Sequence, residues 1–154
     1  MLTRQEAVAA ARAWIGTPYV KGARIRGAGC DCETLLEAYL IEIGAAKEFD
    51  LPVYSQDWFC NTTEERYRDE LAKYATCTWE GRCVGTPPAL PGDIAIYRVV
   101  GSKVYNHGGI VTSWPKAIHA YGDQGVCETR PALHPLTTHK EMAIFSIEKL
   151  TKSW

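Results

Sequence analysis

The sequence lacks the features that mark several large classes of protein. It has no run of about 18 apolar residues, so we expect no helix that spans a membrane. The N-terminus turns polar directly after Leu2, without the apolar core of a secretion signal, and we expect synthesis in the cytoplasm without a signal peptide. Seventeen basic against eighteen acidic residues give a net charge of -1. This balance lacks the basic excess of a general nucleic-acid binder, so nucleic acid is not an expected partner.

Length and composition favour one compact domain. The chain has 154 residues, of which 46% are hydrophobic and 23% are charged. That length is enough for one hydrophobic core, and the composition excludes a disordered chain, a collagen-like chain and a coiled-coil rod. We therefore interpret residues 1–154 as a single domain.

The six cysteines do not follow a metal-binding or redox spacing. The C-x-x-C pair of zinc knuckles and thioredoxin-like proteins is absent, and the closest pairs are Cys30 with Cys32 and Cys77 with Cys83. We expect no metal or organic cofactor, although a metal- or cluster-binding module built from these four residues stays open as an alternative. The residues expected to be small buried hydrophobes are Cys60, Cys77, Cys83 and Cys127.

The first half of the chain has helical patterns. A capping box precedes apolar residues at helical spacing, which predicts a helix over residues 3–15. Asp31 has the character of an N-cap, and an apolar stripe behind it predicts a helix over residues 32–43. A second capping pattern, Thr62 with Glu65, predicts a polar helix that ends at about residue 74.

The second half has short apolar runs typical of strands. A proline- and glycine-rich segment over residues 85–92 separates the two halves. Five strands are then predicted, separated by turn residues: 94–97, 109–111, 117–120, 126–128 and 143–147. Helices followed by antiparallel strands indicate an α+β domain.

Cys32 is the candidate nucleophile. If Asp31 caps the helix, Cys32 lies in its first turn, where unpaired backbone N–H groups and the helix dipole favour negative charge. We expect this position to lower the pKa of the thiol and so to activate it. Cys30 lies in the preceding loop, outside that field.

Two of the four histidines can serve a cysteine nucleophile. A turn over residues 113–115 would fold the segments that carry His107 and His119 into a hairpin and bring the two rings side by side. One ring would then act as the base and the other would orient it. His134 and His139 fall in a loop rich in proline and threonine and are expected to be exposed to solvent.

Five motifs, in this order, resemble the NlpC/P60 family of cell-wall cysteine peptidases. They are Gly-Thr-Pro-Tyr (16–19), Gly-Cys-Asp-Cys (29–32), Pro-Gly-Asp-Ile (91–94), Asn-His-Gly-Gly-Ile (106–110) and Ala-Ile-His-Ala (117–120). The Gly-Cys-Asp-Cys form is similar to the short members that phages and gene transfer agents encode. The resemblance implies a papain-like fold with N-terminal helices packed on an antiparallel sheet of five to six strands.

The resemblance also implies roles for single residues. Cys32 matches the nucleophile, His107 the general base and His119 the third, orienting residue of a Cys-His-His peptidase. Tyr19 matches a tyrosine that shapes the oxyanion and substrate site, to which Asp31 is also assigned. The implied substrate is the peptidoglycan stem peptide, cut at the γ-D-glutamyl to diaminopimelate bond.

The sequence departs from the family beside the nucleophile. Glu33 and Thr34 replace the usual Ser-Gly, and the added negative charge would oppose thiolate formation. The basic loop residues Lys21, Arg24 and Arg26 either bind stem-peptide carboxylates or are merely solvated.

The resemblance implies a place of action at the tip of a phage-like tail. There the protein would open the cell wall in the periplasm of the target cell during DNA delivery, with tail hub and baseplate proteins as partners. A catalytically silent structural tail-tip component with the same fold is the alternative.

Overall fold

The computed structural model describes residues 1–48, 58–82, 86–99, 101–137 and 140–150. The helices are α1 (Arg4–Arg12), α2 (Cys32–Glu42) and α3 (Arg66–Leu71), with 3-10 turns η1 (Trp58–Asn61), η2 (Gly122–Gln124) and η3 (Pro131–Leu133). The strands are β1 (Arg24–Ile25), β2 (Gly29–Cys30), β3 (Thr76–Arg82), β4 (Ile94–Tyr97), β5 (His107–Ser113), β6 (Lys116–Tyr121), β7 (Gly125–Thr129) and β8 (Glu141–Ser146). Cys83 and His139 lie outside the described residues. No helix in these ranges is long and apolar enough to cross a membrane.

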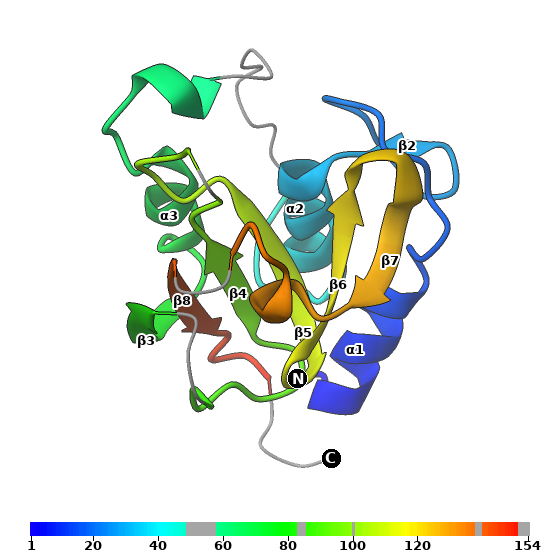
Figure 1. The fold of residues 1–154 in the computed structure, drawn as a ribbon. Coiled ribbons are helices and arrows are strands. Elements are labelled where there is room, and N and C mark those ends of the chain that lie inside the picture. Colours follow the sequence, from blue (N-terminus) through cyan, green and yellow to red (C-terminus); the bar gives the residue numbers. More distant parts are fainter. Residues whose placement is uncertain (49–57, 83–85, 100, 138–139, 151–154) are drawn as a thin grey trace.

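A six-stranded antiparallel sheet with the order β3-β8-β4-β5-β6-β7 forms the centre of the fold. The N-terminal helices α1 and α2 pack on one face of it, and α2 lies against β5 and β6 (Figure 1). This arrangement confirms the predicted α+β class and the packing of N-terminal helices on an antiparallel sheet. The five predicted strands correspond to β4 to β8.

The central strands are buried on both faces, and their side chains alternate between two apolar clusters. Ile94 and Ile96 of β4 join the main core beneath the helices, whereas Ala95 and Tyr97 point into a smaller cluster on the opposite face. Ala132 of η3 belongs to this second cluster, and Figure 1 shows η3 in front of the sheet. The sheet is therefore covered on both sides next to the strands that carry the histidines.

The predicted secondary structure differs from the observed one at strand β3 and at the start of α3. Strand β3 was not predicted, because it is an edge strand whose residues are mostly exposed and lack an apolar alternation. The Thr62–Glu65 capping box does not form either. The hydroxyl of Thr62 accepts the N–H of Glu64, and the Glu65 side chain instead accepts the N–H of Tyr105 at 3.0 Å.

The cysteines also differ from the expectation of buried packing residues. Cys30 is fully buried in the main core, although it was assigned to a loop. Cys60 and Cys77 are exposed, and Cys127 is half-buried. The side chain of a strand residue faces the core or the solvent according to its register, which composition alone does not reveal.

Candidate active site

Asp31 begins helix α2 and orients Cys32. One oxygen of its carboxylate accepts the N–H groups of Glu33 and Thr34, each at 2.9 Å, and the other accepts the N–H of Gly22 at 2.7 Å. The predicted N-cap is therefore confirmed. Because Asp31 is buried and used in this way, it does not reach the hollow that Cys32 lines, so its assignment to the oxyanion or substrate site is not supported by its position.

Cys32 opens onto a hollow of about 380 Å³, which we call the Cys32 hollow. Its thiol lies 3.8 Å from the carbonyl oxygen of Asn106, the residue before His107. The walls of the hollow are formed by Tyr19, Cys32, Val99, Asn106, His107, Ala120, Tyr121, Gly122 and Asp123. The candidate nucleophile and the candidate base thus face the same space.

The two candidate histidines are in direct contact. Nε2 of His107 lies 2.8 Å from Nδ1 of His119, and Nε2 of His119 lies 2.6 Å from the Thr129 hydroxyl on β7. Strands β5 and β6 pair across the turn at 114–115, which confirms the predicted hairpin. His107, His119 and Thr129 thus form a hydrogen-bonded row, in which Nδ1 of His107 is the one ring nitrogen without a contact to another member.

The tautomers of His107 and His119 decide whether His107 can act as a base. If His119 donates its Nε2–H to the Thr129 oxygen, then Nδ1 of His119 must accept the Nε2–H of His107. In that order Nδ1 of His107 carries a lone pair. The opposite order would place the proton on Nδ1 of His107 and remove its basic character.

Gly108 allows the helices to approach the strand next to His107. A Cβ at this position would lie 2.8 Å from the Tyr67 hydroxyl and 2.9 Å from Cδ1 of Leu36. The same Tyr67 hydroxyl donates a hydrogen bond to the carbonyl oxygen of Cys32 at 3.1 Å. Tyr67 therefore links helix α3, the first turn of α2 and the strand that carries the candidate base.

The thiol is held neutral at rest. Burial raises the pKa of Cys32 well above its ordinary value, and the charges of Glu33 and Asp31 raise it further. Burial also lowers the pKa of His107 to about 3 and that of His119 to about 4. The expectation that the helix start lowers the thiol pKa is therefore wrong. The negatively charged cap takes the N–H groups of the first turn, and desolvation outweighs the helix dipole.

The negative charge next to Cys32 has a partner. Arg66 contacts both oxygens of Glu33, at 3.2 Å and 2.7 Å, and its guanidinium stacks on the ring of Trp58 at 4.5 Å. Burial raises the pKa of Glu33, and the charge of Arg66 opposes that shift. The carboxylate of Glu33 is thus paired with an arginine on α3.

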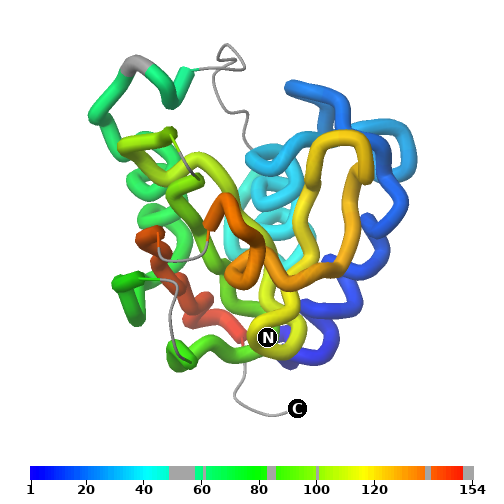
Figure 2. Tube along the Cα trace, viewed as in Figure 1, coloured from blue at the N-terminus to red at the C-terminus, as the bar shows by residue number. Residues whose placement is uncertain are grey.

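Tyr19 lies beside Cys32, as the sequence motif implies. Tyr19 forms an isolated β-bridge with Cys30. Just before it, the N–H of Gly16 donates to the carbonyl oxygen of Val126, and the N–H of Val126 donates to that of Thr17, each at 2.9 Å. Figure 2 shows this N-terminal segment beside β7. Burial first, and then the charges around Cys32, raise the pKa of Tyr19. Its phenol therefore stays protonated and can donate a hydrogen bond into the Cys32 hollow.

The basic loop is largely occupied by internal ion pairs. Arg24 pairs with Glu37 and Glu48, and Arg26 lies 3.8 Å from Glu42. Lys21 is exposed, and its charge opposes the rise in the pKa of the Cys32 thiol. Of the three basic residues, Lys21 is the one positioned to act on the site.

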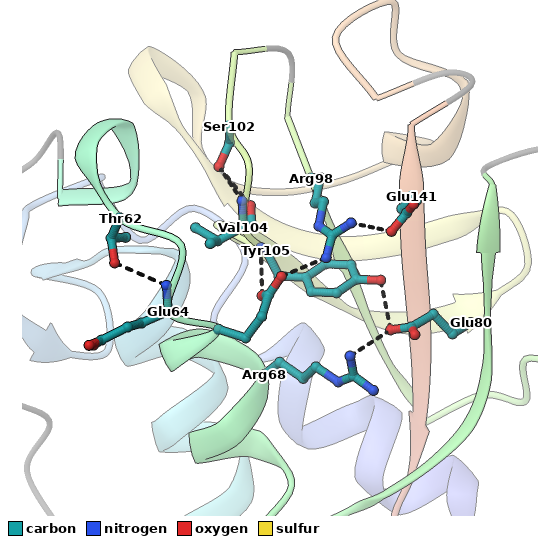
Figure 3. Close-up of polar contacts among 10 residues, drawn as sticks. Thr62, Glu64, Arg68, Glu80, Arg98, Ser102, Val104, Tyr105 and Glu141 are labelled. Carbon is teal, nitrogen blue, oxygen red and sulfur yellow. Dashed lines mark hydrogen bonds and ion pairs between the residues drawn. The ribbon is translucent and has the colours of Figure 1, made fainter.

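A polar network holds the loop that leads to His107. Arg98 pairs with Glu65 at 2.6 Å and also with Glu141, and it stacks on the Tyr105 ring at 4.7 Å (Figure 3). The Tyr105 hydroxyl donates to Glu80 at 2.9 Å. These contacts tie the loop to α3, β3 and β8, so the position of Asn106 and His107 depends on the far edge of the sheet.

Several residues at the site were not identified from the sequence. They are Arg66, Tyr67, Asn106, Tyr121, Thr129 and His134. His134 was expected to be exposed, but it is half-buried and its Nε2 lies 3.2 Å from the Tyr121 hydroxyl. The described residues contain no group of three or more His, Cys, Asp or Glu arranged to hold a metal ion.

The chain matches known proteins in structure and not in sequence. No protein-family model matches it, and no curated protein matches it in sequence. The NlpC/p60 domain of the peptidoglycan hydrolase SagA is 18% identical, with a TM-score of 0.58 over 93% of this chain and 98% of that domain. NlpC1 from Trichomonas vaginalis is 16% identical, with a TM-score of 0.59 over 94% of this chain and 43% of that protein.

A non-catalytic protein is also similar to the chain. RipD from Mycobacterium tuberculosis, a non-catalytic NlpC/p60 domain protein adapted to peptidoglycan binding, is 15% identical, with a TM-score of 0.51 over 96% of this chain and 97% of that chain. At these identities the likeness establishes the fold, which is that of NlpC/P60 domains. The fold occurs with and without catalysis, so the side chains at the site must carry the functional argument.

Proposed function

We propose that this protein is a cysteine peptidase that hydrolyses an amide bond in the peptidoglycan stem peptide. The observation that carries the proposal is the convergence of Cys32, the hydrogen-bonded pair His107–His119 and Tyr19 around one hollow. A cysteine, a base and a group that orients the base are the parts that acyl transfer requires.

The first step forms a thioester. Nδ1 of His107 takes the proton of the Cys32 thiol as the sulfur attacks the amide carbonyl carbon. The backbone N–H of Cys32, which as a first-turn group has no intrahelical acceptor, and the Tyr19 hydroxyl stabilise the negative oxygen. The imidazolium then gives its Nδ1 proton to the leaving nitrogen, the C–N bond breaks and the amine departs.

The second step regenerates the enzyme. His107 takes a proton from water, which attacks the thioester carbonyl, and the thiol leaves with a proton from His107. The product is a free carboxylate. Burial raises the pKa of Cys32 and lowers that of His107, which favours the neutral forms of both and supports a proton transfer that accompanies nucleophilic attack.

His119 and Thr129 position the base. The Thr129 hydroxyl accepts the Nε2–H of His119, which makes Nδ1 of His119 an acceptor and leaves a lone pair on Nδ1 of His107. The same contact stabilises the imidazolium, since His119 accepts its Nε2–H. Thr129 does not line the Cys32 hollow and acts on the base through His119, so it is a positioning residue.

The specific bond and the place of action follow from the sequence motifs. The bond between γ-D-glutamate and diaminopimelate is proposed from the motif order. Action at a phage-like tail tip, with hub or baseplate partners, is proposed from the Gly-Cys-Asp-Cys form of residues 29–32. Co-purification with tail particles tests the second point, because a protein absent from them has another place of action.

A non-catalytic role is the alternative, and the existence of RipD with the same fold supports it. The intact Cys32–His107–His119 arrangement favours catalysis, since a purely structural chain has no need to retain it. A structural protein would bind peptidoglycan without turnover.

Muropeptide analysis distinguishes the proposed peptidase from a non-catalytic peptidoglycan-binding protein. Purified peptidoglycan is incubated with the wild type, with Cys32→Ala and with Cys77→Ala, which changes an exposed cysteine away from the hollow. We expect new stem-peptide fragments from the wild type and from Cys77→Ala, and none from Cys32→Ala. Equal release by all three proteins, or by none, contradicts the proposed function.

A further inference from the structure

A second hollow of about 360 Å³ adjoins the first. His107, Tyr121 and Val99 line both, so the two hollows meet at the candidate base. Cys32 and Tyr19 line only the first. The second hollow therefore lies on the side of His107 that faces away from the nucleophile.

Reaction geometry indicates which part of a substrate reaches this space. The acyl carbon bonds to the sulfur of Cys32, and its oxygen faces the Tyr19 side. The leaving nitrogen must face His107, which supplies its proton. The chain that follows the leaving nitrogen is thus directed past His107 and Tyr121 into the second hollow.

The wall of the second hollow is built from the segment after β7. Leu133 and Leu136 are 61% and 42% exposed there, so this wall presents apolar surface to a ligand in the hollow. Thr137 is buried, and its hydroxyl donates to the carbonyl oxygen of His134 at 3.0 Å. This apolar wall is therefore held in place before any ligand arrives.

The proton positions at the junction of the hollows are set by a backbone group. The N–H of Leu136 donates to Nδ1 of His134 at 3.1 Å, so this nitrogen carries no proton in that contact. Neutral His134 then bears its proton on Nε2, which donates to the Tyr121 oxygen at 3.2 Å. The hydrogen of the Tyr121 hydroxyl is not used by His134 and can be donated to a ligand.

We propose that the second hollow binds the leaving segment of the peptide substrate. The Tyr121 hydroxyl donates a hydrogen bond to a carboxylate oxygen of that segment. The inference rests on the proposed function. Arg130 lines the same hollow and is exposed, so its charge complements a carboxylate. Leu133 and Leu136 contact the aliphatic part of the same segment.

Two synthetic peptides test the inference through turnover. They share a γ-D-glutamyl acyl part and differ only in the end of the leaving residue, a free carboxylate in one and a carboxamide in the other. We expect the wild type to prefer the carboxylate by about tenfold or more in kcat/KM, as for a hydrogen bond to a charged group. Tyr121→Phe removes one oxygen and should bring the ratio close to one, and Arg130→Gln should lower it in part. Tyr19→Phe should slow both peptides alike and keep the ratio.

Binding to an inactive protein keeps the inference separate from the proposed function. The two leaving segments alone, with carboxylate or carboxamide ends, are titrated into Cys32→Ala with and without Tyr121→Phe. A carboxylate preference that Tyr121→Phe abolishes supports the inference even if no peptide is cleaved, in which case only the proposed peptidase fails. Equal binding of both segments, or a preference that survives Tyr121→Phe in a folded protein, overturns the inference.

Discussion

Replacing Thr129 by valine tests the proton order of the histidine chain. Valine has nearly the shape of threonine and lacks only the hydroxyl, which lies 2.6 Å from Nε2 of His119. His119 is 4% exposed, so water does not easily replace the lost partner. An unsatisfied buried donor costs about 1–3 kcal/mol, which is the expected fall in the free energy of unfolding.

The effect on catalysis follows from the same contact. Without the acceptor at Nε2, His119 no longer favours the tautomer that leaves a lone pair on Nδ1 of His107. Loss of about 1–3 kcal/mol of transition-state stabilisation corresponds to a fall in kcat of about 5- to 160-fold. KM should stay within about twofold, because Thr129 does not line the Cys32 hollow and its replacement by valine barely changes the shape of the second hollow, which it does line.

The assay compares three variants. Thr129→Ser keeps the hydroxyl and should retain most of kcat. Thr112→Val removes another buried hydroxyl, 3.4 Å from the carbonyl oxygen of Lys116 and away from the histidine pair, and controls for general loss of stability. ¹⁵N NMR of the imidazole rings reports whether Nδ1 of His119 is unprotonated in the wild type. The reasoning is refuted if folded Thr129→Val keeps kcat within twofold, or if Thr129→Ser is equally impaired.

Three further predictions concern pH and buried charge. The pKa values of the histidine pair, about 3 and about 4, lie below their ordinary 6.5, so the unfolded state binds more protons between these values. Stability should therefore fall as pH drops from about 6.5 to about 4, and urea unfolding at several pH values measures this; unchanged stability would contradict it. Arg66→Met should destabilise the protein by about 1–3 kcal/mol because it leaves the half-buried carboxylate of Glu33 without its charged partner, and the added change Glu33→Gln should recover much of this loss in thermal unfolding. Arg4→Met removes the guanidinium that lies 2.8 Å from Asp93, in an ion pair whose side chains are 5% and 1% exposed. Urea unfolding should show that the free energy of unfolding falls by about 3–5 kcal/mol. A fall of less than about 1 kcal/mol would mean that the remaining hydrogen bonds of Asp93 suffice.

Local patterns predicted the elements whose hydrogen bonds are local. The capping box at Thr3 and the N-cap at Asp31 form as expected, because each side chain bonds to backbone N–H groups two or three residues away. The first helix ends at Arg12 and not at residue 15, since the residues after Arg12 turn toward β7. The hairpin of β5 and β6, which brings His107 next to His119, could also be predicted from the sequence, because a short turn sets its register.

Distant contacts account for the failures. The Thr62–Glu65 pattern has the residues of a capping box, but Glu65 is taken by Tyr105 and Arg98, which are more than thirty positions away. Thr129 was not recognised because its contact with His119 depends on the pairing of β6 with β7. His134 was judged by the composition of its loop, whereas the fold of that loop places its ring against Tyr121.

The amino-acid order of this chain already contains the helix start at Cys32, the histidine hairpin and the α+β class, since these depend on neighbours within a few residues or one turn. The state of the nucleophile was decided by the tertiary structure. Its pKa depends on how far packing removes the thiol from water, on the Asp31 carboxylate that takes the N–H groups of the first turn, and on the Glu33 charge that Arg66 balances from another helix. Desolvation and charge pairing act through space, and only the folded chain brings those groups together.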